Sequence, residues 1–278
     1  MKTTIKILKV FGAISLLLTS NILLAQTNTS PTQTVCAGSL AEPYLINPPT
    51  TGSTYQWSLS GGGILNLGLT SDNITIDWGI TPGTYTVTVV ETDVNGCLGI
   101  PVTVDVTVIP LPTATVATSQ TACFGSIIPD LLAIGANVTW YDDVALTNQV
   151  GTGNSFATGQ TAVGLYTYYV TESLNGCEGP SIPVTLEIYS LPVSPLATSQ
   201  VACVGGVIPD LTATGTNVIW YDDVALTNQV GTGLTFSTGQ TNPGVYTYYV
   251  TDIDANGCES AAVTVTLEIY SSPVSPLA

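Results

Sequence analysis

The chain has 278 residues, with 3 Lys and Arg, 19 Asp and Glu, no His and a formal net charge of −16. Because the basic residues (Lys2, Lys6 and Lys9) all precede residue 10, the remainder cannot neutralise phosphates. This excludes nucleic-acid binding and disfavours an anionic membrane surface. Because the chain has no His, and no Lys or Arg after residue 9, it can form neither a Ser-His-Asp triad nor a Schiff base on lysine. We therefore predict that the chain is not an enzyme.

Residues 1–25 are predicted to be a secretory signal peptide. The basic start is followed by an apolar run that ends at Ala25. This run is short for a membrane span and is interrupted by polar residues. We therefore expect a secreted or cell-surface, extracellular protein that is not inserted in the membrane once the signal is removed.

An internal repeat divides the rest of the chain into modules. The string WYDDVALTNQVGTG occurs at Trp140 and again at Trp220, and the flanking sequences also align, at an offset of about 80 residues. We predict modules at 26–110, 111–190 and 191–271, joined by stiff Pro-bearing linkers. Residues 272–278 repeat, with one change, the linker at 191–197 that opens the third module. We therefore expect them to begin a further, truncated repeat. Further modules of the same polypeptide are accordingly expected partners.

The secondary-structure signal is β throughout. Apolar and polar residues alternate over 102–108, 182–188 and 263–269, which indicates strands with one buried face. Asn-Gly, Gly-Thr-Gly and Thr-Gly-Gln turns separate about seven short strands in each module. The predicted fold class is all-β: tandem immunoglobulin-like antiparallel β-sandwiches, arranged as beads on a string.

Two aromatic positions fit an immunoglobulin-like topology. Trp57, Trp140 and Trp220 follow the first cysteine of each module at the place of a core tryptophan on the third strand. Tyr166 and Tyr246 open the strand before the second cysteine, as a tyrosine corner would.

Six cysteines are distributed as two per module. An even number of cysteines in an exported chain indicates disulfides. The sequence has neither a Cys-x-x-Cys motif nor a His that would indicate a zinc site. We expect each module to close its own bridge between an edge strand and the Asn-Gly-Cys turn. The expected disulfide cysteines are Cys36 with Cys97, Cys123 with Cys177, and Cys203 with Cys258.

The acidic pairs Asp142–Asp143 and Asp222–Asp223 are weak candidates for Ca²⁺ ligands, together with Asn148 and Asn228. Hard oxygen ligands suit Ca²⁺, although the spacing matches no EF-hand. The alternative is a polar turn in which Asp caps the bend after the Trp strand. No cofactor is expected beyond this possible cation.

Repeated tyrosines are a second candidate site. Flat aromatic surfaces can bind sugars, and about half of the rings on alternating strands should face outward; the alternative is cross-strand packing. The candidates are Tyr141, Tyr168, Tyr169, Tyr221, Tyr248 and Tyr249.

The second and third modules resemble the immunoglobulin-like domain that accompanies the C-terminal sorting domain of type IX-secreted Bacteroidota proteins. The matching elements are Ile-Pro-Asp-Leu, Trp-Tyr-Asp, Gly-Thr-Gly, Tyr-Thr-Tyr-Tyr-Val and Asn-Gly-Cys. The first module, with Tyr-Gln-Trp-Ser, Ile-Asp-Trp and Gly-Thr-Tyr-Thr-Val, is similar to the PKD-like modules of the same proteins. The resemblance implies a non-catalytic spacer or stalk of an adhesin. The alternative is a module array that binds a surface glycan or protein.

Overall fold

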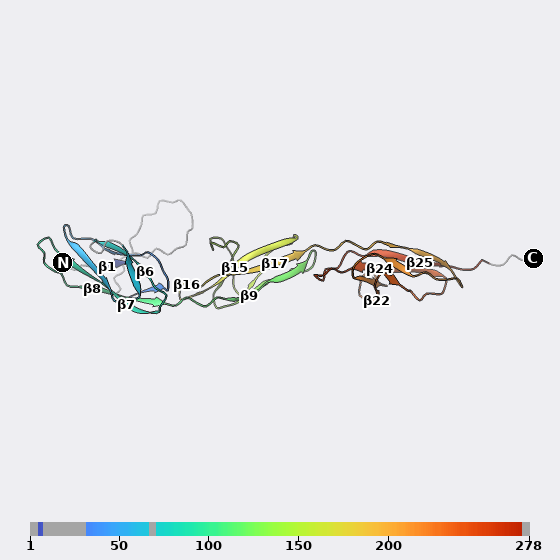
Figure 1. Cartoon of the computed structure of the whole chain (residues 1–278), viewed down its shortest axis with the longest axis horizontal. Coiled ribbons are helices and arrows are strands. Elements are labelled where there is room, and N and C mark those ends of the chain that lie inside the picture. Colours follow the sequence, from blue (N-terminus) through green and yellow to red (C-terminus); the bar gives the residue numbers. More distant parts are fainter. Residues whose placement is uncertain (1–4, 8–31, 67–70, 274–278) are drawn as a thin grey trace, which may run out of the picture. The chain divides into compact units, whose positions relative to one another are not determined.

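The computed structural model describes residues 5–7, 32–66 and 71–273 (Figure 1). The chain forms two compact units. Unit 1 comprises Met1–Thr118, Leu132–Phe156 and Thr167–Val184, and unit 2 comprises Ser119–Leu131, Ala157–Tyr166 and Thr185–Ala278. The boundary between the units therefore passes through the second predicted module.

The strands of the first module form two sheets, one of which also contains β1 from the predicted signal peptide. One has the order β2-β8-β7-β4, and the other has the order β1-β3-β6-β5. The strands are β1 (Ile5–Ile7), β2 (Thr32–Cys36), β3 (Glu42–Ile46), β4 (Thr54–Leu59), β5 (Gly63–Asn66), β6 (Asn73–Trp78), β7 (Gly83–Thr92) and β8 (Val102–Ile109). Pairing is antiparallel except between β2 and β8, which run parallel with Cys36 opposite Ile109.

The core of the first module lies between these sheets. On β8 the valines at 104, 106 and 108 are buried, while Thr103 and Asp105 are exposed, as the alternation predicts. Trp57 is 3% exposed, and its indole Nε1 donates to the carbonyl of Ser71. Trp78 donates in the same way to the Tyr44 hydroxyl. Indole N–H groups that are buried need such acceptors, so the two tryptophans fix the packing of the sandwich.

The second module contributes strands to both units. In unit 1, β9 (Val116–Thr118) pairs with β11 (Leu131–Ile134), and β12 (Val138–Tyr141) pairs with β13 (Gln149–Thr152) and β15 (Gly164–Leu174). In unit 2, β10 (Gln120–Cys123) runs parallel to β17 (Ile182–Tyr189). The remaining short strands are β14 (Ser155–Phe156) and β16 (Cys177–Glu178).

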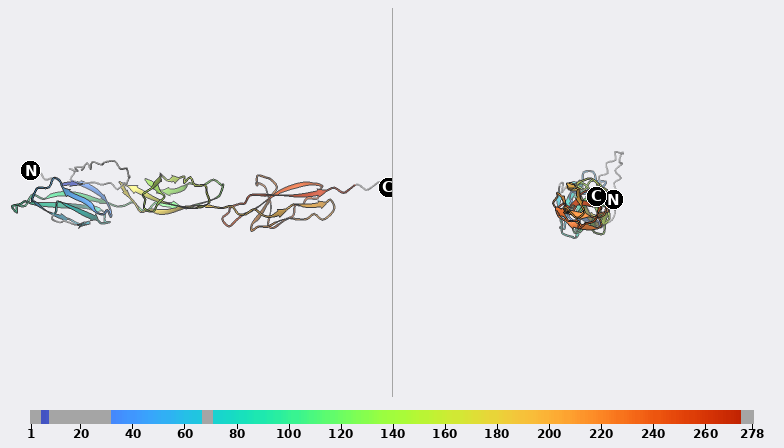
Figure 2. Two further views of the ribbon diagram at one scale, coloured as in Figure 1. Left: turned by 90° about the horizontal axis from the view of Figure 1, so that it is seen from above. Right: turned by 90° about the vertical axis from the view of Figure 1, so that its right-hand side faces the viewer.

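The third module has the same strand pattern, all of it in unit 2. Its sheets have the orders β19-β25-β24-β21-β22 and β18-β20-β23. Figure 2 shows the same strands in two further views. The strands are β18 (Ala197–Thr198), β19 (Gln200–Cys203), β20 (Leu211–Ala213), β21 (Val218–Tyr221), β22 (Gln229–Thr232), β23 (Thr235–Phe236), β24 (Gly244–Asp252) and β25 (Val263–Tyr270).

An aromatic stack organises the core of the third module. The fully buried Trp220 stacks on Phe236 at a centroid distance of 5.4 Å, and Phe236 meets Tyr248 edge-on at 5.1 Å. Gly231 makes room for this stack, because a Cβ there would lie 2.6 Å from the Phe236 ring. Trp140, Phe156 and Tyr168 repeat the arrangement in the second module.

The tyrosine corners are also present. The Tyr246 hydroxyl donates to the carbonyl of Asn242, and the Tyr166 hydroxyl donates to that of Ala162. Tyr85 of the first module makes the same bond to Thr81. These bonds, the buried tryptophans and the paired sheets confirm the prediction of an all-β chain of immunoglobulin-like sandwiches.

The predicted signal peptide is described only at Ile5–Ile7. These residues form β1, which pairs antiparallel with β3 at Tyr44, Leu45 and Ile46. The rest of 1–25 lies outside the described residues, so the signal peptide stays a prediction. If it is removed, β3 becomes an edge strand of its sheet.

Candidate functional sites

Both disulfides join one module to the next. Cys36 at the end of β2 is bonded to Cys177 of the second module, within unit 1, with a Cα–Cα distance of 5.5 Å. Cys123 at the end of β10 is bonded to Cys258 of the third module, within unit 2, also with a Cα–Cα distance of 5.5 Å. Cys97 and Cys203 are free and exposed.

The expectation of one bridge inside each module is therefore wrong. In the first module, Cys36 lies opposite Ile109 at one end of β8, whereas Cys97 precedes Val102 at the other end. Eight extended residues separate the two ends by roughly 23 Å, while a disulfide needs Cα atoms closer than about 7 Å. Cys203, opposite Tyr270, and Cys258, before Val263, are separated by β25 in the same way.

Short linkers bring the correct partners together. The first cysteine of each module lies at the end from which the chain leaves for the next module. The hairpin that carries the second cysteine packs near the incoming linker: a Cβ on Gly179 would lie 2.9 Å from the carbonyl oxygen of Pro112. In the third module the Ser194 hydroxyl, on the linker, donates to the carbonyl of Ala261. Exit end and entry hairpin thus meet at each junction.

The acidic pairs lie in a tight loop after β12 and β21. The Asp143 carboxylate accepts bonds from the Thr147 backbone N–H and hydroxyl and from the Asn148 N–H, at 2.8 to 3.1 Å. Both Asp142 oxygens accept from the Asn148 side-chain amide. Asp223 and Asp222 make the equivalent bonds to Thr227 and Asn228. These carboxylates therefore act as acceptors for the bend itself.

The same bonds shift the acidity of the loop. Backbone N–H donation from Asn148, and then from Thr147, lowers the pKa of Asp143 below its ordinary value. Donation from Asn228 and Thr227 lowers the pKa of Asp223 for the same reason. The described residues contain no group of three or more His, Cys, Asp or Glu that could hold a metal ion. Calcium binding by Asp142, Asp143, Asp222 and Asp223 stays an untested hypothesis, and the bonds within the loop favour the alternative of a polar turn.

Sequence reasoning missed two glutamates beside the hairpin cysteines. The Glu259 carboxylate accepts bonds from the hydroxyls of Tyr221, at 2.9 Å, and Thr251, at 2.6 Å. Glu178 does the same for Tyr141 and Thr171. Burial, and then the hydrogen bond to Glu178, raises the pKa of Tyr141 to about 12. The repeated Asn-Gly-Cys-Glu string was the only sequence signal for these contacts.

The six candidate tyrosines do not form an exposed aromatic surface. Tyr168, Tyr221 and Tyr248 are buried, and the other three, Tyr141, Tyr169 and Tyr249, are half-buried. Tyr168 and Tyr248 pack between the sheets, where they meet the Phe rings of the facing sheet edge-on.

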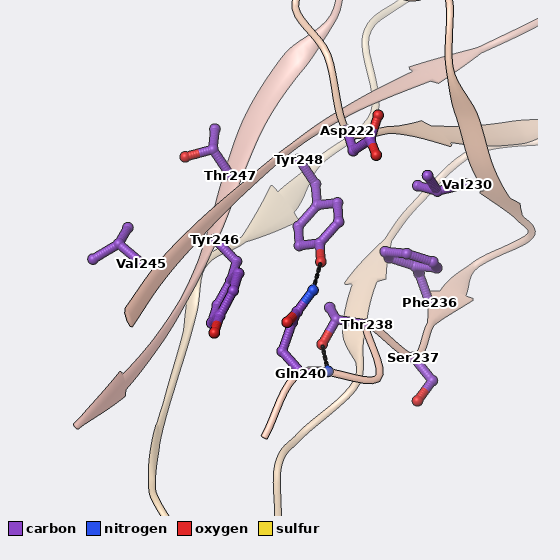
Figure 3. Close-up of a pocket in the computed structure, with 10 residues that line it drawn as sticks. All are labelled: Asp222, Val230, Phe236, Ser237, Thr238, Gln240, Val245, Tyr246, Thr247 and Tyr248. Atoms are coloured by element: carbon purple, nitrogen blue, oxygen red, sulfur yellow. Dashed lines mark hydrogen bonds between the residues drawn. The ribbon is translucent and has the colours of Figure 1, made fainter. Parts of the chain in front are cut away.

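A cavity of about 470 Å³ lies beside β24 in the third module (Figure 3). The Tyr248 hydroxyl accepts a bond from the Gln240 side-chain amide at 3.3 Å, and the Gln240 backbone N–H donates to the Thr238 hydroxyl. Figure 3 shows Tyr248 pointing toward Gln240, with the Phe236 ring next to the Tyr248 ring. Asp222 is the one charged residue in the lining. The cavity is therefore an open polar recess over the aromatic stack.

Family models match the two end modules. Residues 23–104 match a PKD-like domain, and residues 192–270 match the Ig-like domain described as CHU_C associated. The resemblance to these two kinds of module is confirmed. Ig-like and PKD-like domains are typically non-catalytic and occur in extracellular repeat proteins. The described residues contain no helix long and apolar enough to span a membrane.

The solved structures that match this chain are distant. Fibronectin(III)-like modules of Clostridium thermocellum CbhA are 18% identical, with a TM-score of 0.33 over 56% of this chain and 91% of that chain. Domains 3–5 of Drosophila OTK are 12% identical, with a TM-score of 0.30 over 87% and 94%. The sialic acid binding region of a Streptococcus sanguinis SK1 adhesin is 13% identical, with a TM-score of 0.30 over 86% and 76%. A comparison with curated proteins finds no match.

Proposed function

We propose that the chain is a structural spacer, the stalk of a cell-surface adhesin. The observation that carries this proposal is the pair of disulfides between consecutive modules. Each junction has two covalent connections, the Pro-bearing linker and the disulfide. A spacer that transmits tension benefits from a second connection, because the linker alone would let a module unravel under load.

The two disulfide loops overlap, and this limits how far the chain can be stretched. When the chain is pulled from its ends, the path passes from Cys36 to Cys177, back to Cys123 and across to Cys258. Only the segment between Cys123 and Cys177, roughly 50 residues, then adds length between the outer cysteines, at about 3.5 Å per residue. With both disulfides reduced, roughly 220 residues can extend, which is about fourfold more.

Single-molecule stretching of the full chain tests the proposal. The contour length gained between residues 36 and 258 should be about fourfold smaller under oxidising conditions than after reduction. A Cys36→Ser, Cys123→Ser double variant should extend fully without reductant, which controls for effects of the reductant itself. Equal extension of the oxidised and reduced chain would refute the disulfide junctions on which the proposed stalk role rests.

Ligand binding is the alternative function, and the cavity beside β24 is the observation that favours it. Its polar atoms and tyrosine rings suit a sugar or a short polar peptide segment. A glycan array and a pull-down with the full chain test this alternative. Saturable binding that is lost in Gln240→Ala but kept in the second-module variant Gln160→Ala would assign the ligand to the third module.

A further inference from the structure

The recess beside β24 holds hydroxyl groups whose protons are not used within the chain. Tyr248 is 5% exposed, and its hydroxyl accepts a bond from the Gln240 side-chain amide. The Thr238 hydroxyl accepts in the same way from the Gln240 backbone N–H. In the described part of the chain, neither hydroxyl donates a bond of its own. Each therefore keeps a proton for an acceptor on a ligand.

Gln240 places an acceptor beside these two donors. Its side-chain nitrogen is bonded to Tyr248, which leaves the amide oxygen to accept from a ligand. Figure 3 shows Gln240 next to both Tyr248 and Thr238, with the two bonds dashed. A hydroxyl group carries one proton and two lone pairs, so two neighbouring hydroxyls of a ligand can bond to this donor and acceptor at once.

Aromatic rings at the same recess are fixed before any ligand arrives. Figure 3 shows Tyr246 and Tyr248 pointing the same way from β24, as residues two apart on a strand do. The half-buried Tyr246 is tied through its hydroxyl to the carbonyl of Asn242. Phe236, also half-buried, is held between Trp220 and Tyr248. Rings that are already ordered cost little conformational entropy when a ligand packs on them.

The charge of the recess disfavours an anionic ligand. The one charged residue in its lining, Asp222, is a carboxylate. The sequence has no His, and no Lys or Arg after Lys9, so no side chain of the module can neutralise an anion. Neutral hydroxyl, amide and ring groups are what the recess offers besides Asp222. These groups suit a neutral ligand rich in hydroxyls.

Strand pairing around the recess disfavours an extended peptide. β24 is paired with β21 on one side and with β25 on the other, so its backbone groups are already used. β23, which contributes Phe236, is only two residues long. Extended peptides commonly bind by adding a strand to an open sheet edge. The strands that line the recess offer no open edge of useful length.

We infer that the recess of the third module binds a neutral sugar through two adjacent hydroxyls. One sugar hydroxyl donates to the Gln240 amide oxygen, and its neighbour accepts from the Tyr248 hydroxyl. The apolar face of the sugar ring packs on the Tyr246 ring. The inference rests on the ligand-binding alternative proposed above and names its ligand class.

The second module provides the matched reference for this site. It repeats the glutamine as Gln160, and the Gln160 backbone N–H donates to the Thr158 hydroxyl at 3.3 Å, as Gln240 does to Thr238. Its sequence differs where Ala157 replaces Ser237 and Leu165 replaces Val245. The second module therefore offers one hydroxyl fewer and a larger apolar side chain, so we assign the sugar to the third module.

The test begins with the full chain on an array of neutral and acidic oligosaccharides, where we expect binding to neutral sugars alone. The strongest neutral sugar is then titrated by calorimetry. Tyr248→Phe keeps the ring and removes only the hydroxyl, and Gln240→Ala removes the acceptor. Each should weaken binding about tenfold, as expected for one lost hydrogen bond to the ligand. Gln160→Ala should leave the affinity unchanged, and circular dichroism checks that each variant is folded.

Several results would overturn the inference. These are an array without a neutral sugar among its ligands, unchanged binding in Tyr248→Phe, and an equal loss in Gln160→Ala. Binding of an acidic sugar or of a peptide, abolished by Gln240→Ala, would overturn the ligand class and keep the ligand-binding alternative. The stretching experiment reports separately on the stalk.

Discussion

The first and third modules fill the cores of their sandwiches with different residues. The first module buries fourteen hydrophobic residues in its core cluster, with two indoles bonded to internal acceptors. The third module buries nine around one aromatic stack, and adds a buried disulfide cysteine and a glutamate that accepts two hydroxyl bonds. An immunoglobulin domain of the antibody type places a disulfide at the centre of its core. In this chain the aromatic residues fill that place, and the cysteines are available for links between modules.

The largest effect is expected from Trp220→Ala in the third module. Removing a fully buried indole should cost about 3–5 kcal/mol, because it leaves a cavity under Phe236. Trp57→Ala should cost a similar amount in the first module, where more apolar residues remain to keep the sandwich folded. Urea denaturation followed by circular dichroism measures both variants, because Trp220 is the one tryptophan of the third module and cannot serve as the probe. If Trp220→Ala unfolds no more easily than wild type, the stack is not what holds the third module together.

The second-largest difference between the third and first modules is expected from replacing the hairpin cysteine. Cys258→Ser breaks the bond to Cys123 and should lower the free energy of unfolding by about 2–5 kcal/mol. Cys97→Ser, in the equivalent hairpin of the first module, changes an exposed free thiol and should stay within about 0.5 kcal/mol. Thermal denaturation without reductant measures the difference. Equal losses in both variants would contradict the assigned pairing.

A smaller effect is expected at the residue that follows each hairpin cysteine. Glu259→Ala leaves the hydroxyls of Tyr221 and Thr251 without their acceptor and should cost about 1–3 kcal/mol. Leu98, its counterpart in the first module, is exposed, so Leu98→Ala should change stability by about 0.5 kcal/mol or less. Chemical denaturation of both variants checks this. If Glu259→Ala leaves the free energy of unfolding unchanged, water replaces the carboxylate as the acceptor.

Acid should weaken both modules through different aspartates. The pKa of Asp223 is lowered by backbone donation from Asn228 and Thr227, and that of Asp93 chiefly by the Cys97 N–H. In the folded protein the pKa values of both aspartates lie below the ordinary 3.8. The stabilisation that each carboxylate contributes is therefore present above pH 3.8 and is lost as the pH falls through the pKa of the folded state. Melting temperatures between about pH 6 and pH 2 should decline less steeply in Asp223→Asn. An unchanged slope would mean that this loop opens before it titrates.

The smallest effect is expected from calcium. Because the oxygens of Asp142, Asp143 and their counterparts already accept bonds from the loop, we expect no change in melting temperature between EDTA and millimolar Ca²⁺. A rise of several degrees, absent in Asp143→Asn, Asp223→Asn, would restore the calcium hypothesis.

The sequence predicted the strands, the core tryptophans and the tyrosine corners because each depends on local periodicity or on a fixed spacing. Cysteine pairing depends instead on which ends of the strands meet across a linker, and sequence alone leaves connectivity open. The parallel pairing of β2 with β8 places Cys36 at the far end of β8 from Cys97, and this pairing could not be read from the sequence. The Tyr221–Glu259 contact could not be predicted, because it joins the end of β21 to the residue after the hairpin cysteine through side-chain directions.

The overlap of the two disulfide loops also changes what a protease can do to this chain. A single cut anywhere between Cys36 and Cys258, in either linker or in any hairpin, leaves all the pieces in one covalent molecule. Even two cuts, one before Cys123 and one after Cys177, release no fragment. After residue 9 the chain also lacks the lysines and arginines at which trypsin-like proteases cleave. A nicked copy of this array therefore stays one covalent molecule.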